Sequence, residues 1–402
     1  MPSVLLALIS LLVLIPLRSR YLFGGDSAEF ATVSNTWSVA HPPGYPLYSF
    51  LSNVIRMLLP SNYNLEAVNI LSIVPTVLSV IIIYYILVHI TKEKIVSFIT
   101  SLFYLFLFPV WLYAVVPEVF ALNIFFISLI TLLILKFNEH NNKILKISIF
   151  FVFGLATAHH HTFIVFLIPW ILLIKDKRGF FLKDLSRPLI GLLLGFSIYI
   201  YAPVASFFKP PLDVENAGSI DGFVRLILRA AYGTFRSYSG VKTSIANQFF
   251  GVFSIFIYMI QDFRLLGSAI MIYGLVTMRK KNSLFFRFIV SALIMQALFL
   301  FYINFYLSVP FGLAIFERFL MAPYLVFTLL LGYGLASFKS ALIKTVHNIS
   351  KLSVVRNAVV PVFYLFVLIF TLIVGYSNYL VIRHIPTLNS FDLFARDILA
   401  TV

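Results

Sequence analysis

The chain has 402 residues, of which 61% are hydrophobic and only 11% are charged, and its formal net charge is +15. Soluble domains contain about 45–50% apolar residues, so this composition excludes an ordinary water-soluble enzyme and indicates a polytopic membrane protein. Because the chain has no cysteine, it forms neither disulfides nor thiolate metal sites. Its stability must therefore come from helix packing.

Hydrophobic runs predict an all-α integral membrane protein of about eleven transmembrane helices in a single domain, residues 1–402. The first run lacks a basic n-region and a small-residue cleavage site, so we expect it to be a retained helix. Three runs, at 145–158, 161–174 and 265–278, are too short to cross upright and are expected to be tilted or re-entrant. The others lie near 3–18, 66–90, 95–115, 119–136, 188–207, 288–309, 317–337 and 357–381.

The basic residues predict the orientation. With the N-terminus inside, the inner loops hold 18 of the 30 Lys and Arg residues but only four of the 15 acids. This asymmetry is the positive-inside pattern of a multi-pass protein in the cell membrane with a cytoplasmic N-terminus. The net charge is therefore a topology signal, and we expect membrane lipid as a partner and no nucleic acid.

This orientation gathers the remaining ionisable residues on the outer face. The outer face then carries a first outer loop, 19–65, and a second outer loop, 208–264. The C-terminal helices follow in the chain at 265–402. A transporter is expected to carry its polar groups near the bilayer midplane, so this distribution favours an enzyme that works at the outer leaflet. The sequence also has no nucleotide-binding signature.

The first outer loop carries a pair of acids in the segment GGDSAEF. Asp26 and Glu29 are three residues apart, so in a helix they share one face, and a carboxylate there could take a proton from an acceptor hydroxyl. The same D-S-A-E pattern is also a capping box, in which Asp26 caps the helix and Glu29 binds the cap amide. The pattern leaves both interpretations open.

The next motif, HPPGYPLY, has three prolines in the six residues from His41 to Pro46 and cannot be helical. It predicts a rigid turn that orients a surface helix at 47–59 and forms a wall of a binding site, with His41 and Tyr45 facing the substrate. His41 could bind a phosphate or cap a neighbouring backbone group.

Further along the chain, acidic and imidazole groups mark two more places on the outer face. Glu118 follows Pro117 at the start of a span, where a buried acid needs a functional partner or a metal. Three consecutive histidines, 159–161, point in different directions on a helix, so they do not form a zinc site. We expect one of them, His160, to face the site.

In chain order, the segments GGDSAEF, AHPPGYPLY, PEVFALN, HHHTF, YAPVASFFKPPL, LRAAYG and ERFLMAPY resemble the protein O-mannosyltransferase-like family of GT-C membrane glycosyltransferases. The match spans roughly residues 20–240 and returns at 317–324. One departure is His159-His160, where the family usually has Asn-His before the x-Thr step.

The resemblance implies a GT-C bundle with interfacial helices in the first outer loop and an active site facing outside. It also implies inverting transfer of mannose or another hexose from a polyprenyl-phosphate donor to an acceptor hydroxyl on a protein, glycan or glycolipid. Asp26 is then the general base, Glu29 orients it, and Glu118, Asn123 and His160 support the site. A divalent cation that assists the transfer stays open as a cofactor, but the residues identify no metal ligands.

Such a donor needs cations at its phosphate, because negative charge develops there as the sugar leaves. Arg225 and Arg229 are four residues apart and are expected to share a helix face. Tyr232, Arg236, Lys242 and Arg318 lie at the same level. Two alternatives remain, a transporter of lipids or lipid-linked glycans that uses the same cations, and a non-catalytic membrane scaffold.

Overall fold

A computed structural model describes residues 1–60, 63, 65–234, 244–303, 305, 307, 309–349 and 352–393. This part of the chain is helical, with one isolated β-bridge between Val39 and Asp213. The α-helices are α1 (Pro2–Leu17), α2 (Ser27–Thr36), α3 (Pro46–Met57), α4 (Glu66–Thr91), α5 (Lys94–Phe106), α6 (Phe108–Val115), α7 (Phe120–His140), α8 (Lys143–Thr157), α9 (Leu167–Leu173), α10 (Lys177–Leu182), α11 (Ser186–Phe196), α12 (Tyr201–Phe207), α13 (Ile220–Leu228), α14 (Ile245–Lys281), α15 (Ser283–Ile303), α16 (Pro310–Phe319), α17 (Met321–Ile349) and α18 (Ser353–Ile382). The 3-10 helices are η1 (His161–Phe166), η2 (Ser197–Ile200), η3 (Ala230–Tyr232) and η4 (Ile385–Thr387).

The all-α membrane fold is confirmed, but a count of eleven spans is not. Seven helical stretches of the described chain are long and apolar enough to cross a membrane. An eighth is obtained if α5 and α6, which bend by 64° at their junction, are one broken span. Two apolar helices, Pro2–Leu17 and His161–Leu173, fall short of the length of a full span.

Three of the seven candidate spans are much more buried than the other four. In the most apolar stretch of α4 and of α7, 72% of the residues are buried, and in α17 the share is 89%. The corresponding shares are only 33% in α14 and α15 and 28% in α18. Apolar helices with so little burial face lipid, since hydrocarbon does not penalise apolar surface.

Two glycines let helices α8 and α11 approach closely. A Cβ on Gly154 of α8 would lie 2.3 Å from the carbonyl oxygen of Leu192, and one on Gly195 of α11 would lie 2.2 Å from that of Phe151. Small residues serve this purpose at membrane helix interfaces, where association depends on van der Waals packing. The α8–α11 pair in turn carries the chain to α12 and α13 at the outer-loop end.

Part of the segment 208–264, which the sequence predicts to be an outer loop, is helical. Helix α14 begins at Ile245, so residues 245–264, expected in the loop at 208–264, are helical. The helix is interrupted at Arg264, whose backbone has φ 59° and ψ 169°. That interruption falls where the apolar run 265–278 was expected to begin, and the preceding residues supply the length that the run lacks.

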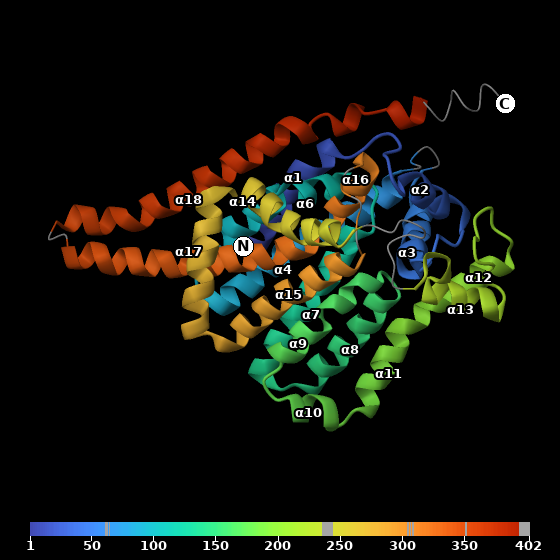
Figure 1. The fold of residues 1–402 in the computed structure, drawn as a ribbon, viewed down its shortest axis with the longest axis horizontal. Coiled ribbons are helices and arrows are strands. Elements are labelled where there is room, and N and C mark those ends of the chain that lie inside the picture. Colours follow the sequence, from blue (N-terminus) through green and yellow to red (C-terminus); the bar gives the residue numbers. More distant parts are fainter. Residues whose placement is uncertain are drawn as a thin grey trace.

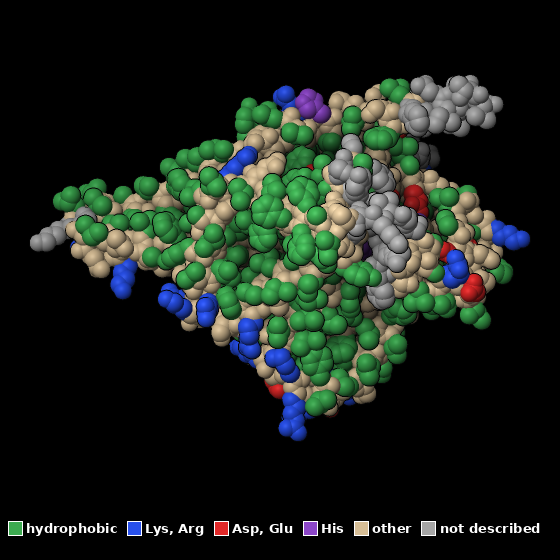
Figure 2. Space-filling view, viewed as in Figure 1, with side chains coloured by type: hydrophobic (Ala, Val, Ile, Leu, Met, Phe, Trp, Pro, Cys, Tyr) green, Lys and Arg blue, Asp and Glu red, His purple; other side chains and the backbone are tan. Residues whose placement is uncertain are grey.

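Charge is separated along the molecule. In Figure 2, Lys and Arg side chains gather at the lower left, where Figure 1 places α10 and the α14–α15 turn. Acidic side chains gather mainly at the right, near α13. Helices α2, α3, α12 and α13 lie at this second end (Figure 1), so the separation of charge expected from the sequence also separates these helices from the basic loops.

We predict that Gly154→Ala lowers the melting temperature of the detergent-purified protein, because the added methyl group meets a backbone carbonyl that cannot move independently of α11. Overpacking of this kind costs about 1–3 kcal/mol. The matched control is Gly251→Ala in α14, where no atom lies within 4 Å of the new Cβ. Equal melting temperatures for the two variants would show that α8 and α11 do not depend on close approach.

Candidate active site

The side chain of Arg318 joins two carboxylates from distant parts of the chain. Its Nη1 lies 3.0 Å from Asp26 Oδ2 and 2.9 Å from Glu118 Oε1. The Glu118 side chain is 2% exposed and the Arg318 side chain 11%, whereas that of Asp26 is 38% exposed. Asp26 is therefore the member of this triad that a substrate can reach.

Local backbone geometry brings the triad together. Asp26 immediately precedes α2, Glu118 lies in the short connection between α6 and α7, and Arg318 is in the last turn of α16. Gly25 has φ 79°, and a Cβ there would lie 2.0 Å from Arg318 Nη2 and 3.3 Å from Glu118 Oε1. Glycine is thus required both for the backbone conformation and for the approach of the guanidinium.

Glu29 binds His41 twice. The backbone N–H of His41 donates to Oε1 and the ring Nδ1 donates to Oε2, both at 2.6 Å. The other ring nitrogen, Nε2, lies 3.2 Å from the hydroxyl oxygen of Tyr45. A carboxylate that binds one imidazole nitrogen fixes the ring and its tautomer, so Glu29 orients His41.

These contacts exclude the capping box. Asp26 occupies the N-cap position of α2, but its side chain accepts no capping hydrogen bond there. Glu29 binds His41 instead of the cap amide. His41 likewise caps no backbone group, because its ring nitrogens are directed at Glu29 and Tyr45. Asp26 and Glu29, for which the sequence allowed either a catalytic pair or a capping box, therefore do not form a capping box.

Burial and neighbours perturb these groups. Burial raises the pKa of Glu118 to about 8, and the charge of Arg318 opposes this only in part. Burial would also raise the pKa of Glu29, but its hydrogen bonds and attraction to His41 outweigh burial and lower it. For His41, burial disfavours the imidazolium, yet Glu29 reverses the effect and raises its pKa. The Glu29–His41 contact thus favours the charged forms of both groups, whereas burial drives the nearby Glu118 towards its neutral form.

The arginines expected on α13 do not share a helix face, which corrects the sequence prediction. Helix α13 ends at Leu228, and Arg229 adopts a left-handed conformation with φ 52°. Arg225 Nε instead pairs with Glu215 Oε2 at 2.9 Å. Arg229 lies over the ring of Tyr232, 5.3 Å from its centroid, and that ring is 6.2 Å from the ring of His41. Arg229 and Tyr232 thus belong to the site, and Arg225 is bound elsewhere.

The three histidines each have a different partner. His159 Nε2 donates to the Val119 carbonyl at 2.9 Å, and His161 Nε2 lies 3.0 Å from the Tyr199 hydroxyl. His160 Nδ1 lies 2.6 Å from Thr162 Oγ1, which also accepts a hydrogen bond from Asn123. Thr162, which the sequence did not single out beyond its motif, therefore connects the two supporting residues.

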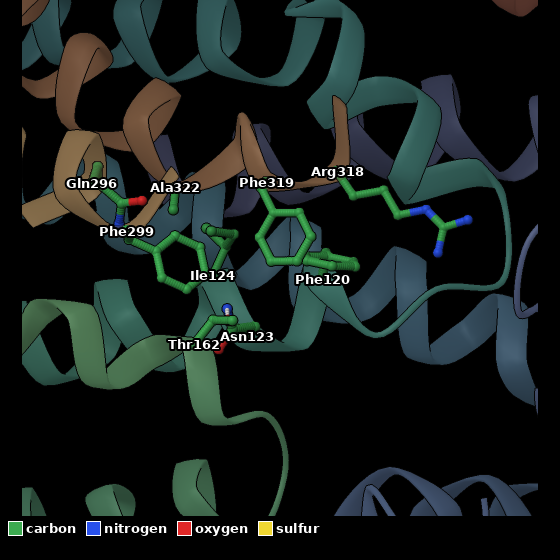
Figure 3. Close-up of a pocket in the computed structure, with 9 residues that line it drawn as sticks. All are labelled: Phe120, Asn123, Ile124, Thr162, Gln296, Phe299, Arg318, Phe319 and Ala322. Carbon is green, nitrogen blue, oxygen red and sulfur yellow. Dashed lines mark hydrogen bonds between the residues drawn. The ribbon is translucent and has the colours of Figure 1, made fainter. Parts of the chain in front are cut away.

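A narrow crevice of about 10 Å³ runs from this polar pair to Arg318. Figure 3 shows Asn123 and Thr162 facing one another on one side of it, while the guanidinium of Arg318 points away from Gln296. The remaining walls are apolar side chains: Phe120, Ile124, Phe299, Phe319 and Ala322. At this volume the crevice is too small to hold a sugar.

Among the described residues, one group of side chains could hold a metal ion. One ligand atom each from Asp26, Glu29 and His41 lies within 4.8 Å of the others. Two carboxylates and an imidazole are ligands that divalent cations accept, although the sequence analysis identified no such set. Each of the three side chains already has a partner, Arg318 for Asp26 and one another for Glu29 and His41.

Several features of the site could not be found from local patterns. The Arg318–Asp26 contact joins residues 292 positions apart, and neither position signals the other. The role of Gly25 is visible only once the guanidinium is placed beside it. Two cations proposed for the phosphate, Arg236 and Lys242, lie outside the described residues.

Comparisons with known proteins give relatives for nearly the whole length of the chain. Residues 26–178 match the family model of the protein O-mannosyl-transferase TMEM260 N-terminal domain. The chain is 27% identical to protein O-mannosyl-transferase TMEM260 of Mus musculus over 400 residues, which cover 94% of this chain and 54% of the relative. It is 28% identical to the protein of the same name from Dictyostelium discoideum over 351 residues, 78% of this chain and 42% of the relative. The chain thus spans about half the length of the curated relatives it matches.

Solved structures show the same fold. The crystal structure of ArnT from Cupriavidus metallidurans bound to undecaprenyl phosphate superposes with a TM-score of 0.60 at 14% identity, over 95% of this chain and 77% of that one. The apo structure of the same protein gives a TM-score of 0.58 at 12% identity, over 95% and 76%. The resemblance to the O-mannosyltransferase-like family and the GT-C fold are confirmed.

We predict that raising the pH from 5 to 8 lowers the free energy of unfolding of the wild type more than that of Glu118→Gln. With its pKa near 8, folded Glu118 retains a proton that the unfolded chain releases near pH 4.5, so raising the pH favours unfolding. Each unit of pKa difference corresponds to about 1.4 kcal/mol. The measurement is the melting temperature of both proteins across this range.

The control is Glu66→Gln, which removes a partly exposed carboxylate from the start of α4. Its melting temperature should follow that of the wild type with pH. If Glu118→Gln also follows the wild type, burial does not perturb Glu118.

Proposed function

We propose that this relative of protein O-mannosyl-transferases is an inverting GT-C glycosyltransferase. It moves a hexose, mannose by analogy with the names of its relatives, from a polyprenyl-phosphate donor to an acceptor hydroxyl of a protein or glycolipid. The undecaprenyl phosphate in the ArnT structure supports the class of lipid carrier. The reaction takes place at the outer face of the cell membrane, and the N-terminus is cytoplasmic.

The observation that carries this proposal is the placement of Arg318 between an exposed and a buried carboxylate. A guanidinium binds phosphate oxygens in the same way as carboxylate oxygens. The donor phosphate therefore competes with Asp26 for Arg318, and its binding releases Asp26 to accept a proton. Glu118 is buried and stays with Arg318, so it acts as a positioning residue.

The transfer then needs one base and several cations. Asp26 takes the proton of the acceptor hydroxyl while the acceptor oxygen bonds to the anomeric carbon. The bond from that carbon to the phosphate oxygen breaks, and its electron pair stays on the phosphate. Arg318 and Arg229 stabilise the resulting charge, and His41, oriented by Glu29, and Tyr45 hold the donor on the opposite side. Attack from the face away from the phosphate gives inversion.

We predict that Asp26→Asn abolishes sugar transfer while preserving the fold. Removing a general base lowers a rate by about 10²–10⁴-fold, and the amide keeps the shape of the side chain. The measurement is transfer of radiolabelled hexose from synthetic polyprenyl-phosphate sugars to membrane acceptors, with the purified variant at a melting temperature matching the wild type. Asp221→Asn, the same change at an exposed position on α13, is the control and should transfer at the wild-type rate.

Two results would contradict this proposal in different ways. Transfer by Asp26→Asn at the rate of Asp221→Asn would remove Asp26 from the chemistry. A wild type that transfers no sugar from any polyprenyl-phosphate hexose, but moves labelled lipid between leaflets, would instead identify a transporter.

We also predict that chelation with EDTA leaves transfer unchanged, because Arg318 and Arg229 supply the positive charge that the leaving phosphate needs. Transfer is compared in membranes before and after chelation, and after Mg²⁺ or Mn²⁺ is restored. Loss on chelation followed by recovery with the cation would assign Asp26, Glu29 and His41 to a metal ion instead.

A further inference from the structure

Helix α13 has three distinct faces along its nine residues. One is buried against the protein, one is apolar and exposed, and one is charged. An ordinary surface helix has only two faces, an apolar one towards the core and a polar one towards water. The additional exposed apolar face therefore needs an explanation.

The buried face of α13 packs against the wall of the active site. Leu226 is fully buried, and its side chain lies 2.8 Å from the position that a Cβ on Gly44 would take. Phe223 packs edge-on against Tyr199, with ring centroids 6.2 Å apart. Because Gly44 belongs to the turn that carries His41, this face fixes α13 beside the catalytic groups.

The exposed apolar face consists of Ile220, Val224 and Leu228, which are four residues apart and follow one stripe. Their exposed fractions are 87%, 46% and 51%. This stripe is exposed in addition to the face that the helix buries against the protein. An exposed apolar stripe of this kind is typical of a helix that contacts lipid or another apolar surface.

The charged face lies next to this stripe and is suited to water. Asp221 and Arg225 are both exposed, and Arg225 pairs with Glu215. A helix with protein on one side, apolar side chains on the second and charges on the third has the composition expected at the boundary between lipid and water.

The neighbouring span identifies the apolar phase. The candidate span Ser186–Phe207 ends at α12, which shares a small buried cluster with Leu226 of α13. At that end Phe207 and Phe208 are 79% and 75% exposed, so two large apolar rings lie on the surface beside α13. In Figure 1, α12 and α13 lie together at one end of the molecule, and Figure 2 shows apolar side chains on the surface there.

We propose that α13 lies in the interface of the outer leaflet, with Ile220, Val224 and Leu228 inserted among the lipids. Just beyond its last turn, Arg229 lies over the ring of Tyr232, and that ring is 6.2 Å from the ring of His41. The helix that contacts the lipid therefore also carries a phosphate-binding arginine to the catalytic groups. It follows, if the proposed function holds, that the donor enters from the membrane along α13, its phosphate at headgroup level and its polyprenyl chain beside the stripe.

The 402-residue chain has no cysteine, so a single introduced cysteine can be labelled specifically. Val224→Cys and Asp221→Cys are each labelled with an environment-sensitive fluorophore in phosphatidylcholine–phosphatidylglycerol vesicles. We expect a nitroxide on the upper acyl chain to quench the label at 224 several-fold more than the label at 221. Iodide in the outer solution should show the reverse order. Leu228→Cys repeats the measurement if the first variant does not fold.

Equal access of iodide to the labels at 224 and 221 would overturn the proposal, because the stripe would then face water. Protection of the label at 224 from both quenchers would also overturn it, since a protein partner would then cover the stripe. Neither quenching measurement requires transfer activity. A wild type without transfer activity would therefore refute the proposed function, while the quenching data would still establish whether α13 contacts lipid.

A second arm tests the route of the donor. Val224→Asp should lower transfer from a long-chain polyprenyl donor in vesicles several-fold, and much less from a short-chain, water-soluble donor. Asp221→Asn is again the control and should change neither rate. If Val224→Asp loses the same share of activity with both donors, the substitution disturbs the site itself. If Val224→Asp transfers from both donors at the wild-type rate, the donor does not pass along α13.

Discussion

The arrangement of the site depends on one buried cation. Arg318 takes its place between Asp26 and Glu118 in a region that is almost closed to water. Charges are costly to bury unless they are paired, so the three side chains hold one another, and with them the first outer loop, the α6–α7 connection and α16. The contacts of Glu29, His41 and Tyr45 then extend this arrangement to the proline-rich turn.

Local sequence was sufficient for features that depend on local physics. Hydrophobic runs located the helices, prolines located the rigid turn at 41–46, and acids in an apolar chain identified Asp26, Glu29 and Glu118. Sequence failed where tertiary contacts decide. The end of α13 at Leu228 separates Arg225 from Arg229 despite their helical spacing, and the start of α14 at Ile245 makes part of the predicted second outer loop helical. The number of spans stays a prediction, because short apolar helices carry the same sequence signal as full spans.

The two acids of the first outer loop show how environment assigns roles to similar groups. Both lie at the start of α2, yet Glu29 is used to orient His41 while Asp26 remains exposed beside Arg318. Their spacing is compatible with a cap, a catalytic pair or a metal site, and only the partners distinguish these. The side chain that is least constrained is the one available for chemistry.

Gly25 contributes no functional group to the site, yet the position of the Arg318 guanidinium depends on it. Any other residue there would displace the guanidinium of Arg318, although the sequence would still contain every ionisable residue of the site. Function at this centre therefore depends on empty space as much as on charge. An engineered enzyme that transplanted only the acids, the histidine and the arginines onto another membrane bundle would reproduce the inventory of groups and still lack the contact that joins them.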